Sequence, residues 1–388
     1  MSARAELPVA APRGRRGPGR AAALVTAAFV AATIATGGAG RAAASGGETL
    51  GFVMSAWDSG FPRGERGHCP KGTNVSEAEL YHVDMKRFRM DVRTLGWEAA
   101  SAKHFPPDAC RDPAAQPDPG FRTFESVDVP VDGLDLDGVE SRPGSGGRCA
   151  HEDFRGTDGT RGIDNQQWRL LGCTPGFQPF FAEIRESHMG RQRQGPILIT
   201  REDHPILIEV AGVDDRVNDD DVRVRFFSSA EAITLDANGD VVPWTSMSVH
   251  RDGRYGSPPV RGRIERGVLT TEPVDLTLRF RQQLLDGDLR WREARLRARI
   301  NDAGRLEGVL GFWWDADNYF RIHNDHQVDG HHTGRLLSLA RSYSCAGMYH
   351  ALQRLADGHP DPATGRCTSL SSARRFEATP VFVIADPD

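Results

Sequence analysis

The richest concentration of potential ligand groups is a run of aspartates and glycines between residues 132 and 165. Calcium takes about six to eight oxygen ligands from carboxylates, amides and backbone carbonyls. Glycines allow a loop to fold back so that such oxygens converge. The sequence therefore predicts a calcium site in this segment. Its candidate ligands are Asp135, Asp137, Asp153, Asp158, Asp164 and Asn165.

The same residues also suit plain turn chemistry. The spacing is not that of an EF-hand, which places ligands at alternate positions and a glutamate at the end of its loop. Asp-Gly pairs form turns, and Asp164 stands where a helix N-cap would precede a short helix ending at Gly172. The segment Asp236 to Asp240 is a weaker candidate for a calcium site, and a hairpin turn is its favoured interpretation.

A second group of potential ligands is the histidine cluster at residues 323–332. His323 and His326 with Asp329 or His331 could bind zinc or another divalent ion. No H-E-x-x-H motif holds them on one helix face, so solvated loop residues are the favoured alternative.

Aromatic residues form a third group at positions 313–320, and Trp244 and Trp291 fall on expected strands. Rings of this kind can stack on sugars, although core packing is the simpler interpretation. The sequence has no G-x-S-x-G nucleophile motif, and its carboxylates are too numerous to nominate a catalytic pair.

The N-terminal segment 1–44 has the order of a cleaved secretory signal. Arginines precede an uncharged stretch at 21–36, and Ala42-Ala43-Ala44 offers a cleavage site. We therefore expect a secreted, periplasmic or envelope protein with no integral membrane span after cleavage. The six cysteines then predict disulfides rather than a metal site. Sequential pairing is the simplest of the many connectivities, namely Cys69–Cys110, Cys149–Cys173 and Cys345–Cys367.

The net charge limits the classes of partner that the protein could bind. The chain of 388 residues carries a formal net charge of −5, which excludes a strongly basic nucleic-acid binder. Removal of residues 1–44, which contain six arginines and one glutamate, would change that charge to −10 and favours cations over phosphates.

The elements that would position these groups are mainly strands. A capping box at Ser76 and Glu79 predicts a helix over 76–95, and Ser344 predicts another over 345–357. Between them, alternating or continuous β-formers separated by Asp-Gly and Asn-Gly turns are typical of an antiparallel sandwich. The expected strands cover residues 197–200, 205–213, 222–228, 232–235, 241–250, 261–269, 274–280, 289–300, 306–313 and 379–384.

Three motifs in the chain resemble those of a group of other proteins. Leu134-Asp135-Leu136-Asp137-Gly138, then Cys149-Ala150-His151-Glu152-Asp153-Phe154, then Asp158 to Gln166 resemble an LDLDG…CxHxDF…DGxxGIDNQ pattern. That pattern is similar to one in a group of secreted proteobacterial and myxobacterial proteins. The resemblance implies export and a shared fold, but no particular reaction. One departure is Gly311-Phe312-Trp313-Trp314, where the group tends to have Gly-Gly-Tyr.

Together these observations predict a mainly β protein: an antiparallel, jelly-roll-like β-sandwich with peripheral N- and C-terminal helices and disulfides. We divide the chain into a signal peptide (1–44), an N-terminal helix with a disulfide-closed Asp/Gly-rich loop region (45–195), the sandwich core (196–313) and a C-terminal part with a His-rich loop, a helix and the last strand (314–388). The expected function is a secreted or envelope-associated binding or structural protein with a calcium site and a carbohydrate or envelope partner. The alternative is a secreted hydrolase acting on polysaccharide or another extracellular polymer.

Overall fold

The structure is a computed structural model, and the unit described below lies within residues 46–388. The residues it describes are 47–58, 69–74, 89–96, 99, 110–142, 149–174, 203–282, 285–324, 327–328, 331–332 and 343–385. The predicted signal peptide, the strand expected at 197–200 and His326 lie outside the described residues.

The unit is built on one 10-stranded sheet in which every pairing is antiparallel. Its strands are β1 (Glu48–Asp58), β2 (Ile206–Val213), β3 (Asn218–Ser228), β5 (Val260–Glu265), β6 (Val268–Thr271), β7 (Val274–Gln282), β8 (Leu285–Ile300), β9 (Leu306–Asp315), β12 (Gly358–Pro360) and β13 (Cys367–Pro380). β1 pairs with β2 on one side and with β13 on the other, so the sheet closes on itself. The two layers expected of a sandwich are thus the facing walls of one closed sheet.

Period-two patterning puts apolar side chains inside the closed sheet. Leu296 and Ala298 are buried while Arg297 and Arg299 between and beside them are exposed, as the alternation in this strand predicts. The interior is filled by one large apolar cluster that includes Phe52, Phe226 and Phe312. It is therefore a packed core.

A smaller apolar cluster lies beneath two short strands. β4 (Ser246–Ser248) and β14 (Phe382–Ile384) pair in parallel, separately from the large sheet. Met247 of β4 and Val381, which directly precedes β14, are buried and pack with Val53 of β1.

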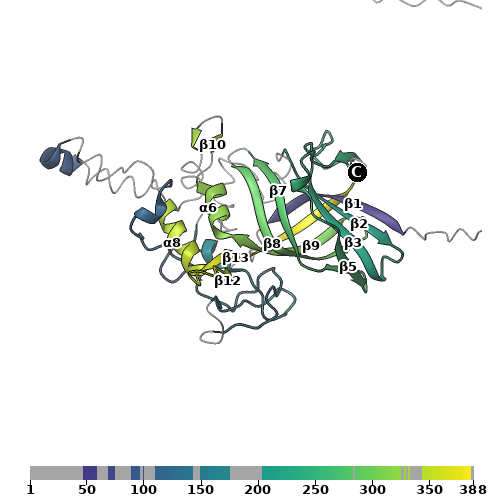
Figure 1. Cartoon of the computed structure of the whole chain (residues 1–388), viewed down its shortest axis with the longest axis horizontal. Helices are drawn as coiled ribbons and strands as arrows, with labels where there is room; N and C mark the ends of the chain where they lie inside the picture. The colour runs from purple at the N-terminus through teal and green to yellow at the C-terminus, as the bar shows by residue number, and fades with distance from the viewer. Residues whose placement is uncertain are drawn as a thin grey trace, which may run out of the picture. The chain divides into compact units, whose positions relative to one another are not determined.

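Helices are few and gather at one end of the sheet (Figure 1), where α6 (Ala316–Asn324) and α8 (Cys345–Leu355) lie near β8, β12 and β13. The expected C-terminal helix is confirmed as α8, with Ser344 as its N-cap. Of the helix predicted over 76–95, residues 89–95 are described and are helical. No helix among the described residues is long and apolar enough to cross a membrane.

Three disulfides are present, but the sequential pairing is wrong. The bonds join Cys69 to Cys173, Cys110 to Cys345 and Cys149 to Cys367, and no described cysteine is free. Cys149 and Cys173 therefore do not close the Asp/Gly-rich loop on itself. Cys110 and Cys149, which lie between β1 and β2, instead bond to Cys345 of α8 and Cys367 of β13, which are distant in sequence.

The mainly β, antiparallel fold with peripheral helices and disulfides is confirmed, and some individual strands differ from the prediction. The strand expected over 261–269 is a hairpin of β5 and β6, turned at Arg266 and Gly267. Residues 232–235 contribute an isolated bridge from Leu235 to Val241 rather than a strand. β1 and most of β13 were not predicted, although β1 pairs with both of its neighbours and closes the sheet.

Candidate metal centre

The Asp/Gly-rich segment is held in shape by isolated bridges rather than by regular strands. Leu134 bridges Asp164, and Phe154 bridges Ile163. The backbone N–H of Asp164 donates to the carbonyl of Leu134 over 3.0 Å. These contacts bring residues about thirty positions apart in sequence into one small loop cluster.

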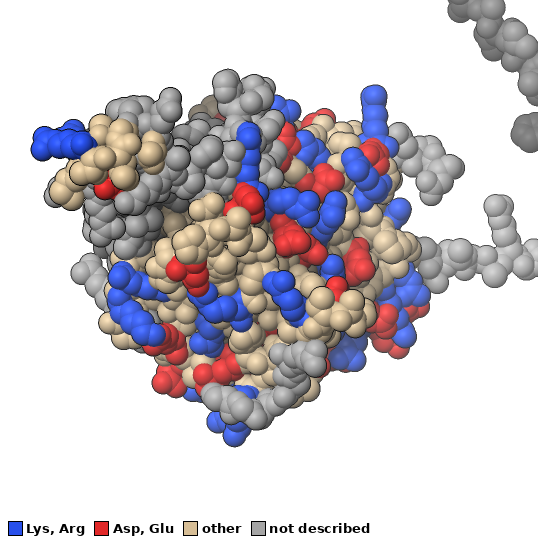
Figure 2. Space-filling model, turned by 60° about the vertical axis from the view of Figure 1, so that its left-hand side comes forward, with Lys and Arg blue, Asp and Glu red and all other residues tan. Residues whose placement is uncertain are grey.

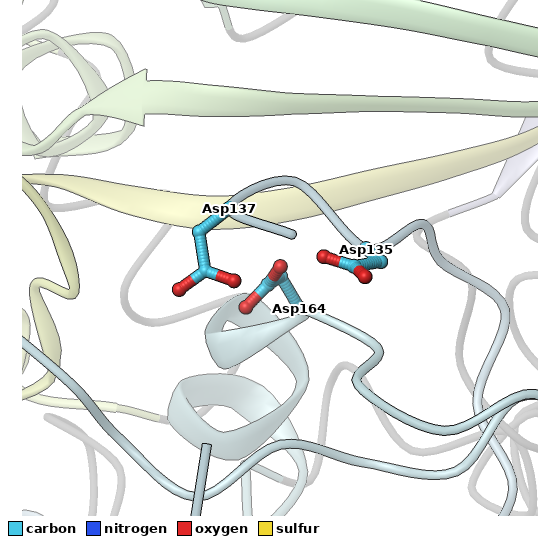
Figure 3. Close-up of side chains that lie close together, drawn as sticks. All are labelled: Asp135, Asp137 and Asp164. Carbon is cyan, nitrogen blue, oxygen red and sulfur yellow. The ribbon is translucent and has the colours of Figure 1, made fainter. Parts of the chain in front are cut away.

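Three carboxylates converge in this cluster. Each of Asp135, Asp137 and Asp164 offers one ligand oxygen, and these atoms all lie within 4.8 Å of one another. Figure 3 shows Asp135 and Asp137 reaching from one loop toward Asp164, which stands just before α3 (Gln166–Leu171). An acidic triad with this spacing could hold a metal ion.

Local hydrogen bonds fix the triad. Asp164 Oδ2 accepts from the Leu136 N–H over 2.6 Å, and Asp135 Oδ1 accepts from the Gly138 N–H over 2.6 Å. Asp137 Oδ1 accepts from the Val139 N–H over 2.8 Å. Gly138 has a φ of 80°, a conformation that suits glycine in this turn. Each carboxylate keeps lone pairs for a further ligand, because one hydrogen bond uses only part of its accepting capacity.

The triad is buried on one side and open on the other. Asp164 is 3% exposed, whereas Asp135 and Asp137 are exposed. An ion could therefore enter from solvent and contact a carboxylate that is itself shielded from water.

Two more carboxyl groups, those of the buried Asp153 and the half-buried Asp357, lie near Asp164. Burial raises the pKa of Asp153 and of Asp164, and the negative charge of Asp137 raises both further. Burial, together with the charge of Asp153, raises the pKa of Asp357 to about 8. The carboxyl groups therefore resist simultaneous ionisation unless a proton or a cation compensates them.

Two of the six candidate ligands do not point into the triad. Asp158 pairs with Arg297 over 2.8 Å, and bonds from Thr160 and this arginine lower the pKa of Asp158 to about 2. Asn165 caps α3, with its Oδ1 accepting from the Trp168 N–H and its amide donating to the Asp132 carbonyl. The structure thus assembles Asp135, Asp137 and Asp164, with Asp153 beside them.

Asp357 and Arg169 were missed because nothing local marks them. Asp357 Oδ1 accepts from the Ser371 N–H over 2.7 Å, far along the chain from the Asp/Gly-rich segment. Arg169 lies over the Phe154 ring and donates to the Glu152 carbonyl. The one sequence signal was indirect. Cys149 lies close to Asp153, Cys367 follows Asp357, and these two cysteines are bonded to each other.

The other predicted groups have structural roles where they are described. His323 lies in α6, where its Nδ1 is 2.8 Å from the Tyr319 carbonyl and its ring stacks on Tyr319. The side chains of His326, His331 and His332 lie outside the described residues. Trp313, Trp314, Tyr319 and Phe320 are buried, so this aromatic group packs the core. Asp236 accepts from Asn238 and Asp240 in a turn, as expected of hairpin chemistry.

Comparisons with protein-family models, with curated proteins and with solved structures find no match for this chain.

Proposed function

We propose that this chain is an exported binding or structural protein of the bacterial envelope, whose Asp/Gly-rich segment is ordered by calcium. The observation that carries the proposal is the convergence of Asp135, Asp137 and Asp164 within 4.8 Å. The signal-like segment 1–44, the three disulfides and the resemblance to secreted proteins support export.

Calcium suits this cluster better than magnesium does. The ligands lie on irregular loop backbone, and calcium accepts flexible geometry with carboxylates, carbonyls and water at about 2.3–2.6 Å. Magnesium demands near-octahedral geometry and retains most of its water. Extracellular calcium modules bind with a Kd of about 10⁻⁴–10⁻³ M, so millimolar calcium would fill the site.

A binding or structural role fits the placement of this cluster. The triad sits on loops outside the closed sheet, and the interior of the sheet is filled by apolar side chains. On the face drawn in Figure 2, basic and acidic side chains are interspersed rather than gathered by sign. The described residues on that face form no continuous positive band of the kind that follows a phosphate backbone.

The hydrolase alternative rests on a different feature, a surface hollow. An open surface hollow is lined by Asp275 and Glu293, together with Pro258, Pro273 and Val274. Asp275 Oδ1 accepts from the Glu293 N–H over 2.9 Å, and Glu293 Oε1 lies 3.3 Å from His359 Nε2. Loss of a polysaccharide-hydrolysing activity in Glu293→Gln would favour this alternative over the binding role.

Calorimetric titration of the metal-stripped protein tests the calcium proposal. Calcium should bind with a stoichiometry of one and magnesium much more weakly. Asp137→Asn should lower the calcium affinity at least tenfold. Asp158→Asn is the matched control, because this carboxylate lies in the same segment but pairs with Arg297. Equal weakening by both variants, or no calcium binding by the wild type, would contradict the assignment.

A further inference from the structure

The two-stranded β4–β14 sheet has one face packed on the core and one face open to solvent. Met247 and Val381 are buried in the smaller apolar cluster, and Val383 packs against it. The parallel register sets Phe382 beside Ser246 and Ile384 beside Ser248. Because side chains alternate along a strand, these four residues lie on the outer face.

This outer face displays large apolar side chains. Trp244, just before β4, is 60% exposed, Phe382 is 54% exposed and Ile384 is 47% exposed. The Trp244 and Phe382 rings lie 6.0 Å apart between centroids and are tilted by 45°. The other described tryptophans are buried or half-buried. A cluster of this kind on a protein surface marks a binding site more often than scattered apolar residues do.

The backbone at Trp244 has a left-handed conformation within a turn. Trp244 has a φ of 61°, which costs roughly 1–2 kcal/mol for a residue with a Cβ atom. Its N–H donates to the Pro380 carbonyl over 2.7 Å and holds this conformation. Arg266 also has a positive φ, and it sits in the tight β5–β6 turn, where such a φ is expected. Trp244 also lies in a turn, directly after Pro243, and a type II turn with proline at its second position requires a positive φ at the next residue, so this turn sets the direction of the ring.

The polar groups on the face decide which ligand it suits. Ser246 and Ser248 are exposed next to the apolar side chains, and none of the described residues that form this face is charged. At its edge Glu231 Oε1 accepts from the Ser248 N–H over 2.6 Å. An anionic membrane surface would require basic residues here. An apolar face of a second copy would cover both serine hydroxyls and leave them without partners, which is costly.

We infer that the β4–β14 face, defined as Trp244, Ser246, Ser248, Phe382 and Ile384, binds a neutral carbohydrate. The apolar faces of sugar rings would stack on Trp244 and Phe382, and sugar hydroxyls would bond to the two serines. Two rings tilted by 45° offer two stacking planes, so the ligand is an oligosaccharide or polysaccharide rather than a monosaccharide. This inference rests on the proposed binding role, to which it adds a surface and a ligand class, and it does not require the metal centre.

Affinity electrophoresis of the whole exported protein tests the inference. The gels would contain hydroxyethylcellulose, laminarin, galactomannan or dextran, and at least one should retard the wild type. Trp244→Asn should reduce that retardation at least tenfold in apparent affinity. Asparagine tolerates the left-handed conformation, so this variant should melt no lower than the wild type. Val217→Ala is the control, because Val217 is 54% exposed but lies elsewhere.

Several outcomes would overturn the inference. These are no retardation by any of the four polysaccharides, equal retardation of wild type and Trp244→Asn, and dimerisation or vesicle binding that depends on Trp244 in its place. The gels would be run with calcium and with chelator below the melting temperature. Retardation that survives while calcium fails to bind would contradict only the metal centre. Calcium binding without retardation would contradict only the carbohydrate surface.

Discussion

The backbone N–H of Leu136 donates a hydrogen bond to Asp164 Oδ2 over 2.6 Å. Leu136 stands between Asp135 and Asp137 in the chain, so this single bond fixes the buried carboxylate against the two exposed ones. One neutral donor does not compensate a buried negative charge next to two others. A bound cation therefore stabilises the loop. The predicted effects of calcium depend on this arrangement of Leu136 and Asp164.

Replacement of Asp164 by asparagine should separate its charge from its hydrogen bond. The asparagine Oδ1 can still accept from Leu136, but the buried charge is gone. At about pH 8 the metal-free variant should be more stable than the metal-free wild type, by about 1–3 kcal/mol. Urea unfolding with and without calcium measures this. A variant that retains the full calcium response would exclude Asp164 as a ligand.

The raised pKa values predict an unusual pH dependence. A carboxyl group whose folded pKa lies above its unfolded value of about 3.9 destabilises the fold increasingly as pH rises toward the folded pKa. Asp357, with a pKa of about 8, and Asp164, with a pKa of about 9, place this window between about pH 4 and pH 9. The metal-free protein should therefore lose stability across the window. Because calcium needs ionised ligands, its stabilising effect should grow with pH. Chemical unfolding at about pH 5.5 and about pH 8 checks both trends, and a calcium effect that shrinks at the higher pH would contradict them.

The disulfide connectivity is directly testable by non-reducing peptide mapping. Cys69–Cys173, Cys110–Cys345 and Cys149–Cys367 should be found without free thiol. The last bond closes a separation of 218 residues, for which chain entropy predicts about 5 kcal/mol of stabilisation. A Cys149→Ser, Cys367→Ser double variant should lose several kcal/mol and weaken calcium binding, since the bond tethers the segment carrying Asp153 to β13. Recovery of sequential peptide pairs would overturn this topology.

Gly308 should be intolerant of a side chain. A Cβ atom there would lie 2.2 Å from the Arg297 carbonyl and 2.5 Å from the Ala298 Cα of the neighbouring strand. Gly308→Ala should therefore push β8 and β9 apart and cost at least about 1–3 kcal/mol. Gly253→Ala, where a Cβ would meet nothing within 4 Å, is the control for the thermal unfolding comparison. Similar melting temperatures for both variants would contradict the β8–β9 register.

Sequence patterns correctly predicted the structural features that depend on residues close together in the chain. The strand alternation at Leu296 to Ile300 and the capped helix α8 follow from local periodicity and were foreseen. Asp135 and Asp137 were foreseen as ligands because Asp-Gly turn chemistry is also local. Asp158 was misassigned because its partner Arg297 is 139 residues away.

The long-range features could not be predicted in the same way. β1 begins in Gly-rich sequence and is stabilised by its pairing with β2 and β13, which no local pattern encodes. The disulfide partners are separated by 104 to 235 residues, so they follow from the path of the chain. Helix α6 was expected as a loop with histidines, and packing of Tyr319 and Phe320 into the core overrides that weak signal.

The most direct test of the metal centre is thermal unfolding of the metal-stripped protein at about pH 7.5 during calcium titration. An ion that binds only the folded state stabilises it by about 2.7 kcal/mol at a hundredfold excess over Kd. The wild type and Asp158→Asn should show this rise in Tm, chelator should reverse it, and Asp137→Asn should show little of it. A wild-type Tm that does not change with calcium would contradict the account.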